Sequence, residues 1–387
     1  MARRPQLLIL TPDFPPGPGG IQVMAHRLAS GIQGFQTRTI ALDSAGAQRF
    51  DSEGSLTVRR VGASGLPRVA RNAVWNAVAL REALRIRPDV VLSLHIVGSP
   101  AATAIRRVLG ARTVQYYHAK EIPVRPRLAA FAADQADVVI AVSDYTAGLI
   151  AETGARVADL RLISPGVDIP IDRTPEQPER PTILTVARLE DQYKGHDVML
   201  RALASVREQV PDVEWVVLGD GSLRAGLERQ VSELNLSGSV RFLGAVPDAA
   251  RNSWLKRANL LAMPSRLPGG GLAGEGFGIA FLEAGAYGKP VVAGNVGGAL
   301  DSVSDGESGL LVDPCDPAAV AGAITRLLLD PELAARLGSA GALRAQSFTW
   351  PAIARRVEAV LFEQLARPRS RRAPSQRQRE QTGRSAR

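Results

Sequence analysis

The chain alternates between short hydrophobic runs and longer segments with helical periodicity. In its first half, apolar runs suited to strands occur at 6–10, 37–42, 56–61, 89–94, 112–117 and 137–142. Segments between them, such as 69–87, repeat apolar residues at helical spacing. Continuous apolar strands that alternate with helices indicate a parallel sheet covered on both faces. The first half is therefore expected to form a doubly wound α/β domain.

The same alternation restarts after residues 163–181, a stretch dense in proline and charge that we interpret as an interdomain linker. Further strand-like runs follow at 182–187, 213–219, 239–244, 259–264, 289–294 and 309–312. The 387 residues are also more than one hydrophobic core usually holds. The pattern predicts two Rossmann-like α/β domains, 1–168 and 169–349, which face each other across a cleft. A final amphipathic helix, 350–366, is expected to pack back onto the first domain.

Composition and charge narrow the class of protein. The chain is 45% hydrophobic and 22% charged, as in folded globular proteins. Its single cysteine, Cys315, forms no internal disulfide, which fits a reducing compartment. No apolar run has the length of a membrane span, and the apolar part of the first 16 residues is too short for a signal peptide. We therefore expect a cytoplasmic protein, unless it binds peripherally to a membrane.

The positive charge is concentrated at the C-terminus. The whole chain carries +9, and residues 367–387, with eight arginines and one glutamate, account for +7 of it. Proline, serine and glutamine are interspersed there without apolar periodicity, so we predict a disordered basic tail. A solvated extension, adhesion to anionic lipid and binding of nucleic acid are the three interpretations of this tail.

Two glutamates stand out in the glycine-rich segment 274–288, GEGFGIAFLEAGAYG. A buried carboxylate without a partner is costly, so Glu275 and Glu283 either face solvent or bind a ligand. A helix that begins at residues 276–278 would offer free backbone N–H groups there and would place Glu283 about two turns from Glu275. A glycosidase would need both carboxylates to flank one bond. Their placement beside candidate phosphate-binding cations favours a nucleotide ligand instead.

Other candidate residues follow the predicted strands. Arg188 and Lys194 come after the strand 182–187, at the end of the sheet where α/β folds bind ligands, and two fixed cations suit a diphosphate. Gly19 and Gly20 precede a helix predicted to begin near residue 21, and their N–H groups suit an anionic oxygen. Backbone groups around Val246 follow the strand 239–244 and could meet a planar base.

Taken together, these motifs resemble the family-4 retaining glycosyltransferases, nucleotide-sugar enzymes with two facing Rossmann-like domains, the GT-B fold. The similarity spans residues 6–366, and within the family it is strongest to the GDP-mannose-dependent phosphatidylinositol mannoside mannosyltransferases. The segment HAKE, 118–121, departs from relatives, in which glycine more often follows the histidine, and this leaves acceptor recognition open. The matching motifs are E-x7-E (Glu275 and Glu283), the diphosphate-binding pair (Arg188 and Lys194), the glycine loop GGIQ (19–22), the first-domain histidine (His118) and the linker SPGVD (164–168).

The resemblance implies transfer of a hexose, expected to be mannose from GDP-mannose, onto a hydroxyl of a lipid or glycan with retained configuration. It implies no cofactor beyond the nucleotide-sugar co-substrate, and no Asp-x-Asp pair for a divalent metal occurs in the sequence. It also assigns roles: the diphosphate to Arg188, Lys194, Gly19 and Gly20; the ribose to Glu283; the hexose to Glu275 and the N–H groups of Gly276, Phe277, Gly278 and Ile279; positioning of the sugar to His118.

A lipid acceptor would require contact with a membrane. The predicted helix within 66–87 combines Trp75 with five arginines, and RPR at 125–127 adds two more. Basic residues beside an interfacial aromatic ring can hold a protein to anionic lipid, here at the inner face of the plasma membrane. The alternative for this helix is an ordinary surface helix. The alternatives for the function of the protein are a nucleotide-sugar epimerase on the same fold and a nucleic-acid-binding protein that uses the tail. The five arginines of the helix are Arg68, Arg71, Arg81, Arg85 and Arg87.

Overall fold

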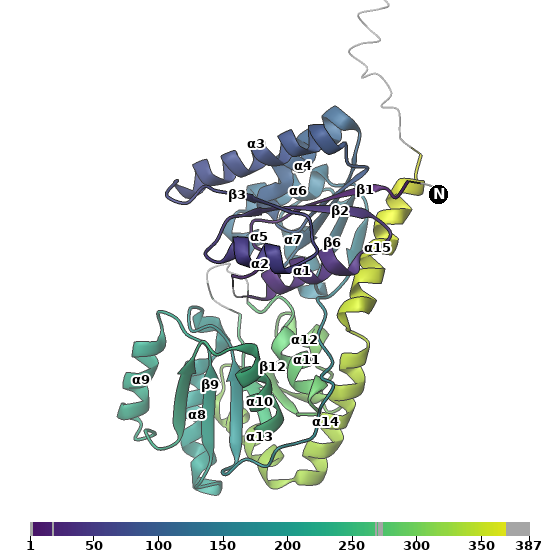
Figure 1. The fold of residues 1–387 in the computed structure, drawn as a ribbon. Coiled ribbons are helices and arrows are strands. Elements are labelled where there is room, and N and C mark those ends of the chain that lie inside the picture. Colours follow the sequence, from purple (N-terminus) through teal and green to yellow (C-terminus); the bar gives the residue numbers. More distant parts are fainter. Residues whose placement is uncertain (1–2, 18, 268, 270–273, 369–387) are drawn as a thin grey trace, which may run out of the picture.

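The apolar runs of the two halves form two separate parallel sheets in the computed structural model of the chain (Figure 1). The structure describes residues 3–17, 19–267, 269 and 274–368. The predicted basic tail lies outside the described residues from residue 369 onward. The two sheets and their covering helices confirm the predicted α/β class with two Rossmann-like halves.

The first sheet has seven strands in the order β3-β2-β1-β4-β5-β6-β7. Six of them correspond to predicted runs, but the edge strand β7 was missed. Its sequence, LRL, is only three residues long, and its two leucines are 43% and 41% exposed, so it lacks the apolar run that marks a buried strand. The strands are β1 Gln6–Leu10, β2 Gln36–Leu42, β3 Val58–Val61, β4 Val90–Ser93, β5 Arg112–Tyr117, β6 Val138–Ala141 and β7 Leu160–Leu162.

Helices cover both faces of this sheet because successive residues of each buried strand point to opposite sides. Leu7 and Ile9 of β1 belong to one core cluster with α1 and α15, whereas Leu8 and Leu10 belong to another with α3 and α4. The helices of this half are α1 Gly20–Gly31, α2 Ala47–Glu53, α3 Arg68–Ile86, η1 Ile96–Gly98, α4 Ser99–Leu109, α5 Glu121–Val124, α6 Pro126–Gln135 and α7 Asp144–Glu152.

The helix α3 confirms the periodicity predicted over 69–87 but overturns one inference drawn from it. Trp75 is fully buried in the core under the sheet, on the same stripe as Ala79 and Ala83. Positions four residues apart share one face of a helix, and here that face meets the sheet. The prediction of an interfacial tryptophan is therefore wrong.

The second sheet has six strands in the order β10-β9-β8-β11-β12-β13, all parallel and all in the predicted runs. Its two faces are covered by α8, α9 and α13 on one side and by α10, α11 and α12 on the other. Its elements are β8 Thr182–Val186, η2 Gln192–Lys194, α8 His196–Gln209, β9 Glu214–Leu218, α9 Arg224–Glu233, β10 Val240–Gly244, α10 Asp248–Arg257, β11 Leu260–Met263, α11 Ile279–Ala286, β12 Val291–Gly294, α12 Ala299–Ser302, β13 Gly309–Val312, α13 Pro317–Leu329 and α14 Pro331–Gln346.

The last helix, α15 Trp350–Ala366, crosses back to the first half, as predicted (Figure 1). Its buried residues Ile353, Val357 and Leu361 share one core cluster with β1 and α1. The linker runs beside the start of this helix, where Val167 donates its backbone N–H to Phe348 O at 2.8 Å. The chain therefore connects the two halves twice, through the linker and through α15.

Candidate functional site

The loops at the carboxyl ends of the two sheets touch each other. A Cβ atom on Gly20, at the start of α1, would lie 3.2 Å from Cδ1 of Ile279, at the start of α11. A Cβ atom on Gly276 would lie 2.2 Å from the backbone O of His118. Only glycine permits this second approach, which brings the predicted donor segment against the predicted sugar-positioning histidine.

Lys194 and Glu275, predicted to bind different parts of the ligand, form an ion pair with each other. The two side chains are 15% and 14% exposed. Burial lowers the pKa of Lys194, but the charge and hydrogen bond of Glu275, together with nearby Tyr193 and Asp191, outweigh burial, and the pKa ends above its ordinary value. Lys194 therefore stays protonated and is held beyond the carboxyl end of β8, with its Nζ 5.1 Å from the centre of the Tyr193 ring.

Arg188 is placed differently from Lys194. Its side chain is 66% exposed, and its guanidinium lies 3.8 Å from Asp191, a contact that holds it only loosely. Asp191 itself is 11% exposed and also accepts a 2.5 Å bond from Lys120, which belongs to the first domain. One carboxylate thus joins a cation from each domain beside the predicted diphosphate site.

The segment Gly274–Gly278, here called the donor loop, precedes a helix that starts later than predicted. The helix α11 begins at Ile279, and Gly278 caps it with a φ of 89°. This left-handed conformation favours glycine and prevents the helix from extending further toward the N-terminus. Gly276 and Phe277 therefore lie in a loop. Glu275 is therefore not on the helix, and only Glu283 is. The N–H groups of residues 276–278 find no acceptor among the described residues.

Glu283 lies inside α11 and pairs with Arg251 of α10 at 2.9 Å. Its side chain is 20% exposed, and burial raises its pKa against the opposing charge of Arg251. Nearby Asp248 and Asp168 raise this pKa further. The segment from Val246 to Arg251, which carries the predicted base-contacting backbone, thus lies beside the predicted ribose-binding carboxylate.

His118 is partly satisfied by the protein itself. Its Nε2 lies 2.8 Å from Leu94 O, and because a carbonyl can only accept, this nitrogen carries the proton. The ring stacks on Tyr116 with centroids 5.6 Å apart. In a neutral ring Nδ1 is then a hydrogen-bond acceptor, which suits a sugar hydroxyl. The positioning role of His118 stays a prediction.

A carboxylate that the sequence did not single out, Asp13, lies near enough to His118 for its pKa to respond to that residue. Burial raises its pKa, and the nearby charges of His118, Arg68, Arg71 and Arg188 oppose that rise. Asp13 follows β1, whereas Arg68 and Arg71 begin α3, and Arg188 comes from the second domain. The first domain therefore brings an acid, a histidine and two arginines toward the donor cations.

Two predicted residues are less directly connected. Gly19 has a φ of 138°, and a Cβ there would meet the side chain of Gln22 at 2.5 Å. Within the described residues no hydrogen bond joins Gly19 or Gly20 to Arg188 or Lys194. Contact of the diphosphate with the glycine loop therefore stays a prediction.

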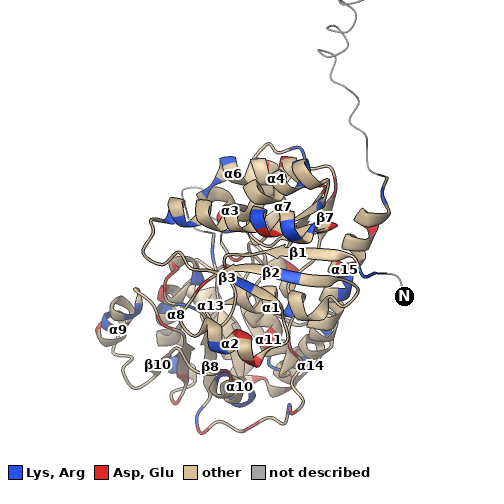
Figure 2. Ribbon diagram, turned by 45° about the horizontal axis from the view of Figure 1, so that its top comes forward, with Lys and Arg blue, Asp and Glu red and all other residues tan. Residues whose placement is uncertain are grey.

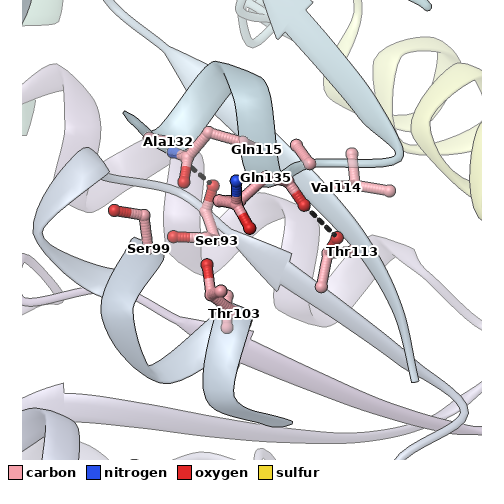
Figure 3. Close-up of a pocket in the computed structure, with 10 residues that line it drawn as sticks. Ser93, Ser99, Thr103, Thr113, Val114, Gln115, Ala132 and Gln135 are labelled. Carbon is pink, nitrogen blue, oxygen red and sulfur yellow. Dashed lines mark hydrogen bonds between the residues drawn. The ribbon is translucent and has the colours of Figure 1, made fainter. Parts of the chain in front are cut away.

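Two hollows lie elsewhere in the first domain, away from the predicted site residues. A polar cavity of about 10 Å³ lies within the first domain, where hydroxyl and amide groups point toward one another (Figure 3). It has room for about one water molecule. A second hollow, of about 560 Å³, opens at the amino end of β1 and is lined by Arg3, Arg4, Arg85 and Arg87. Both are away from the domain junction that carries the predicted site residues.

Comparison with known proteins decides the family. Residues 18–170 match the model of Glycosyltransferase Family 4, and residues 169–344 match that of Glycosyl transferases group 1. Over 359 residues the chain is 32% identical to the GDP-mannose-dependent alpha-(1-6)-phosphatidylinositol monomannoside mannosyltransferase of Mycolicibacterium smegmatis, covering 87% of this chain and 92% of that one. The chain belongs to the family-4 glycosyltransferases. It is accordingly a glycosyl-transferring enzyme.

Two further similarities place this glycosyltransferase more broadly. It is 33% identical over 247 residues to the D-inositol 3-phosphate glycosyltransferase of Corynebacterium diphtheriae, covering 59% of this chain and 56% of that one. A crystal structure of HepE from Anabaena in complex with UDP and glucose aligns with a TM-score of 0.78 and 22% identity, covering 92% and 99% of the two chains. The structural likeness confirms the GT-B fold.

Three residues near the candidate site were not predicted from the sequence: Asp13, Lys120 and Arg251. Asp13 lies in a loop after a strand, a position that could have marked it. Lys120 is one of only four lysines and follows the predicted histidine closely. Arg251 gives no signal, because the chain has 43 arginines and its pairing with Glu283 depends on how α10 packs against α11.

Proposed function

We propose that this glycosyltransferase moves mannose from GDP-mannose to a hydroxyl of an acceptor that carries a phosphorylated inositol. The observation that carries the proposal is the junction at which Gly276, next to the ion pair of Glu275 with Lys194, lies against the backbone O of His118 of the other domain. Relatives similar over most of this chain are named as GDP-mannose-dependent mannosyltransferases, which supports this donor.

In the proposed mechanism the donor diphosphate lies against Arg188 and Lys194, near the backbone of Gly19 and Gly20. Two cations there, of which Lys194 is held in place, would stabilise the negative charge that grows on the diphosphate as the glycosidic bond breaks. Because Lys194 is already held in place, little reorganisation is needed at that moment. No divalent metal or cofactor is proposed to take part.

The hexose would lie between the donor loop and His118. Glu275 and the free N–H groups of residues 276–278 would bind its hydroxyls, and Nδ1 of His118 would accept a further hydrogen bond. Glu283 would bind the ribose, held in place by Arg251. The acceptor hydroxyl would attack from the face of the leaving group and pass its proton to a donor phosphate oxygen. Attack from that face retains the anomeric configuration.

The acceptor side is proposed from charge. The two relatives named above act on acceptors with a common element, an inositol that bears a phosphate. In this chain Arg68 and Arg71 form no ion pair within the described residues, and the buried Nε of Arg71 has no partner there. Two arginines without carboxylate partners suit a phosphate group. Asp13 beside them could accept a hydrogen bond from an inositol hydroxyl.

A membrane-borne acceptor would bring α3 to the lipid surface. Arg81 and Arg85 of this helix are exposed, and Figure 2 marks basic positions in blue on the ribbon. Leu66, Val69, Val74 and Leu84, in and before the helix, are between 39% and 82% exposed. Arg125 is partly exposed, and burial together with the nearby charge of Arg68 lowers its pKa. These aliphatic residues, and not the buried Trp75, would contact the lipid. No helix in the described part of the chain is both long and apolar enough to cross a bilayer.

Thermal stabilisation by nucleotide sugars tests the donor. A ligand that binds only the folded state raises the melting temperature in proportion to the logarithm of its excess over Kd. GDP-mannose is expected to raise the melting temperature at concentrations at which UDP-glucose and UDP-galactose do not. Equal stabilisation by UDP-sugars would contradict the choice of GDP-mannose.

Liposome sedimentation tests the lipid surface. Binding to vesicles with anionic lipid is expected to exceed binding to neutral vesicles, and the double variant Arg81→Ala, Arg85→Ala should reduce the difference. Equal binding to both kinds of vesicle would remove the membrane from the proposal. A variant without residues 367–387 separates tail-dependent adhesion to polyanions from transfer, which is expected to survive the deletion.

A further inference from the structure

The start of α7 in the first domain is bonded to the donor loop of the second. The hydroxyl of Ser143 donates to Gly276 O at 2.6 Å, and the hydroxyl of Tyr145 accepts from Gly274 N at 3.0 Å. Between them, Asp144 N donates to Oδ1 of Asp301 at 2.9 Å. Three consecutive residues thus contact the loop and the neighbouring helix α12.

The donor loop depends on contacts of this kind because of its composition. Three of its five residues are glycines, which lose the most conformational entropy on ordering. Its own domain holds it at Gly298, whose N donates to Glu275 O at 2.8 Å and where a Cβ would lie 2.1 Å from Gly276 O, and through the ion pair of Lys194 with the Glu275 side chain. The residues Ser143–Tyr145 hold it from the first domain.

The far end of this contact is rigid. Arg344 of α14 donates to Asp301 O at 2.6 Å, to Ser302 O at 2.9 Å and to the Ser304 hydroxyl at 3.0 Å. Asp301 is therefore fixed within its own domain before it accepts from Asp144. A first domain that swings away would lose all three contacts at once, whereas Arg188 and Lys194 would keep their places in the second domain.

We propose that Tyr145 is a positioning residue: by bonding Gly274 when the two domains meet, it sets the donor loop so that Glu275 can bind the hexose. The inference rests on the proposed role of Glu275 toward the sugar. It makes binding of the hexose depend on domain closure more strongly than binding of the diphosphate, whose two cations both lie in the second domain. The enzyme would thereby assemble its sugar site only when His118 and the acceptor side are in place.

The variant Tyr145→Phe removes the acceptor oxygen and keeps the ring, which is half-buried. The affinity for GDP-mannose is expected to fall about five-fold, as for one lost hydrogen bond, and the KM for the donor to rise with it. The affinity for GDP, which lacks the hexose, is expected to stay at the wild-type value. Ala151→Ser, on the exposed far end of the same helix, is the matched control and should leave both affinities unchanged.

A second pair of variants guards against a simple folding effect. Asp301→Ala removes the acceptor for Asp144 N, whereas Asp301→Asn keeps an oxygen at that position. Asp301→Ala is expected to weaken the binding of GDP-mannose but not that of GDP. Asp301→Asn is expected to bind GDP-mannose as the wild type does. Binding can be followed by calorimetry on the full chain, with melting temperatures recorded for every variant.

The outcomes separate the two proposals. Equal GDP-mannose affinity in wild type, Tyr145→Phe and Asp301→Ala overturns the positioning role, as does an equal loss of affinity for GDP and GDP-mannose. A wild-type protein that binds no nucleotide sugar more tightly than the corresponding nucleoside diphosphate overturns the proposed function as well.

Discussion

The two sides of the domain junction differ in how their charges are balanced. In the second domain each cation near the predicted donor site has a carboxylate: Lys194 has Glu275, Arg251 has Glu283, and Arg188 has Asp191. In the first domain, Asp13 faces Arg68, Arg71 and His118 together. The cations near the predicted donor site are thus paired, with Asp191 shared with Lys120 of the first domain, whereas the predicted acceptor side has one carboxylate near two arginines and a histidine.

This difference indicates how each side would treat its ligand. Paired cations hold a fixed geometry, which suits stabilisation of charge in a transition state. Unpaired arginines in the first domain attract an anion more strongly but hold it less rigidly, which suits recognition of a phosphorylated acceptor. The following variants test that division, from the largest expected effect to the smallest.

The double variant Arg188→Ala, Lys194→Ala should lower kcat about 1000-fold, because both cations that face the leaving diphosphate are lost. Initial rates of mannose transfer provide the measurement. Arg201→Ala is the control, because within the described residues this exposed arginine of α8 pairs with Asp197 of the same helix alone. Undiminished transfer in a folded double variant would end the assignment of the donor side.

Acid should destabilise the protein through His196, beside the donor cations. It is 2% exposed, neither ring nitrogen has a partner in the described residues, and burial together with Lys194 lowers its pKa to about 4. The unfolded chain binds a proton near pH 6.5, so stability is full above that pH and falls as pH drops toward 4. The loss is about 3 kcal/mol.

Urea unfolding at pH 7 and at pH 4.5 measures this effect. The variant His196→Phe should lose less stability between the two pH values than the wild type does. His26→Asn is the control, since that histidine is only half-buried and should contribute less. An identical acid loss in His196→Phe and wild type would show that other groups cause it.

The pair Arg68→Ala, Arg71→Ala should raise the KM for the acceptor about ten-fold and leave the KM for GDP-mannose unchanged, because these arginines lie on the acceptor side. Arg251→Ala should raise the KM for GDP-mannose and leave the KM for the acceptor unchanged, since it removes the partner of Glu283 on the donor side. Steady-state kinetics with each substrate varied in turn make the comparison. A rise in donor KM for the first pair would contradict the division between the two sides.

The smallest effect is expected at Ala119, in the turn after His118. Its φ of 101° is one that residues with a side chain rarely adopt, and glycine takes the same conformation without strain. Ala119→Gly should therefore raise the free energy of unfolding by about 1 kcal/mol. Ala151→Gly, in the exposed part of α7, should lower it by a similar amount. Chemical denaturation of the two variants gives the comparison, and destabilisation of both would remove the argument from strain.

Part of the site could be predicted because it follows strands directly. Arg188, Lys194 and Glu275 lie in loops that leave β8 and precede α11, and the periodic pattern locates those elements to within a few residues. The start of α11 was placed too early because glycines at 276 and 278 resemble a helix N-terminus, whereas Gly278 takes a left-handed φ of 89°. Local spacing does not reveal that choice of backbone conformation.

The sequence by itself determined the two parallel sheets, the returning helix and the family of the enzyme, since all three depend on apolar periodicity and short local motifs. Only the tertiary structure decided that Trp75 is buried, that Arg251 holds Glu283, and that Tyr145 of one domain bonds Gly274 of the other. These contacts join residues up to 129 positions apart. They are set by how helices and domains pack, and packing leaves no periodic mark on the chain.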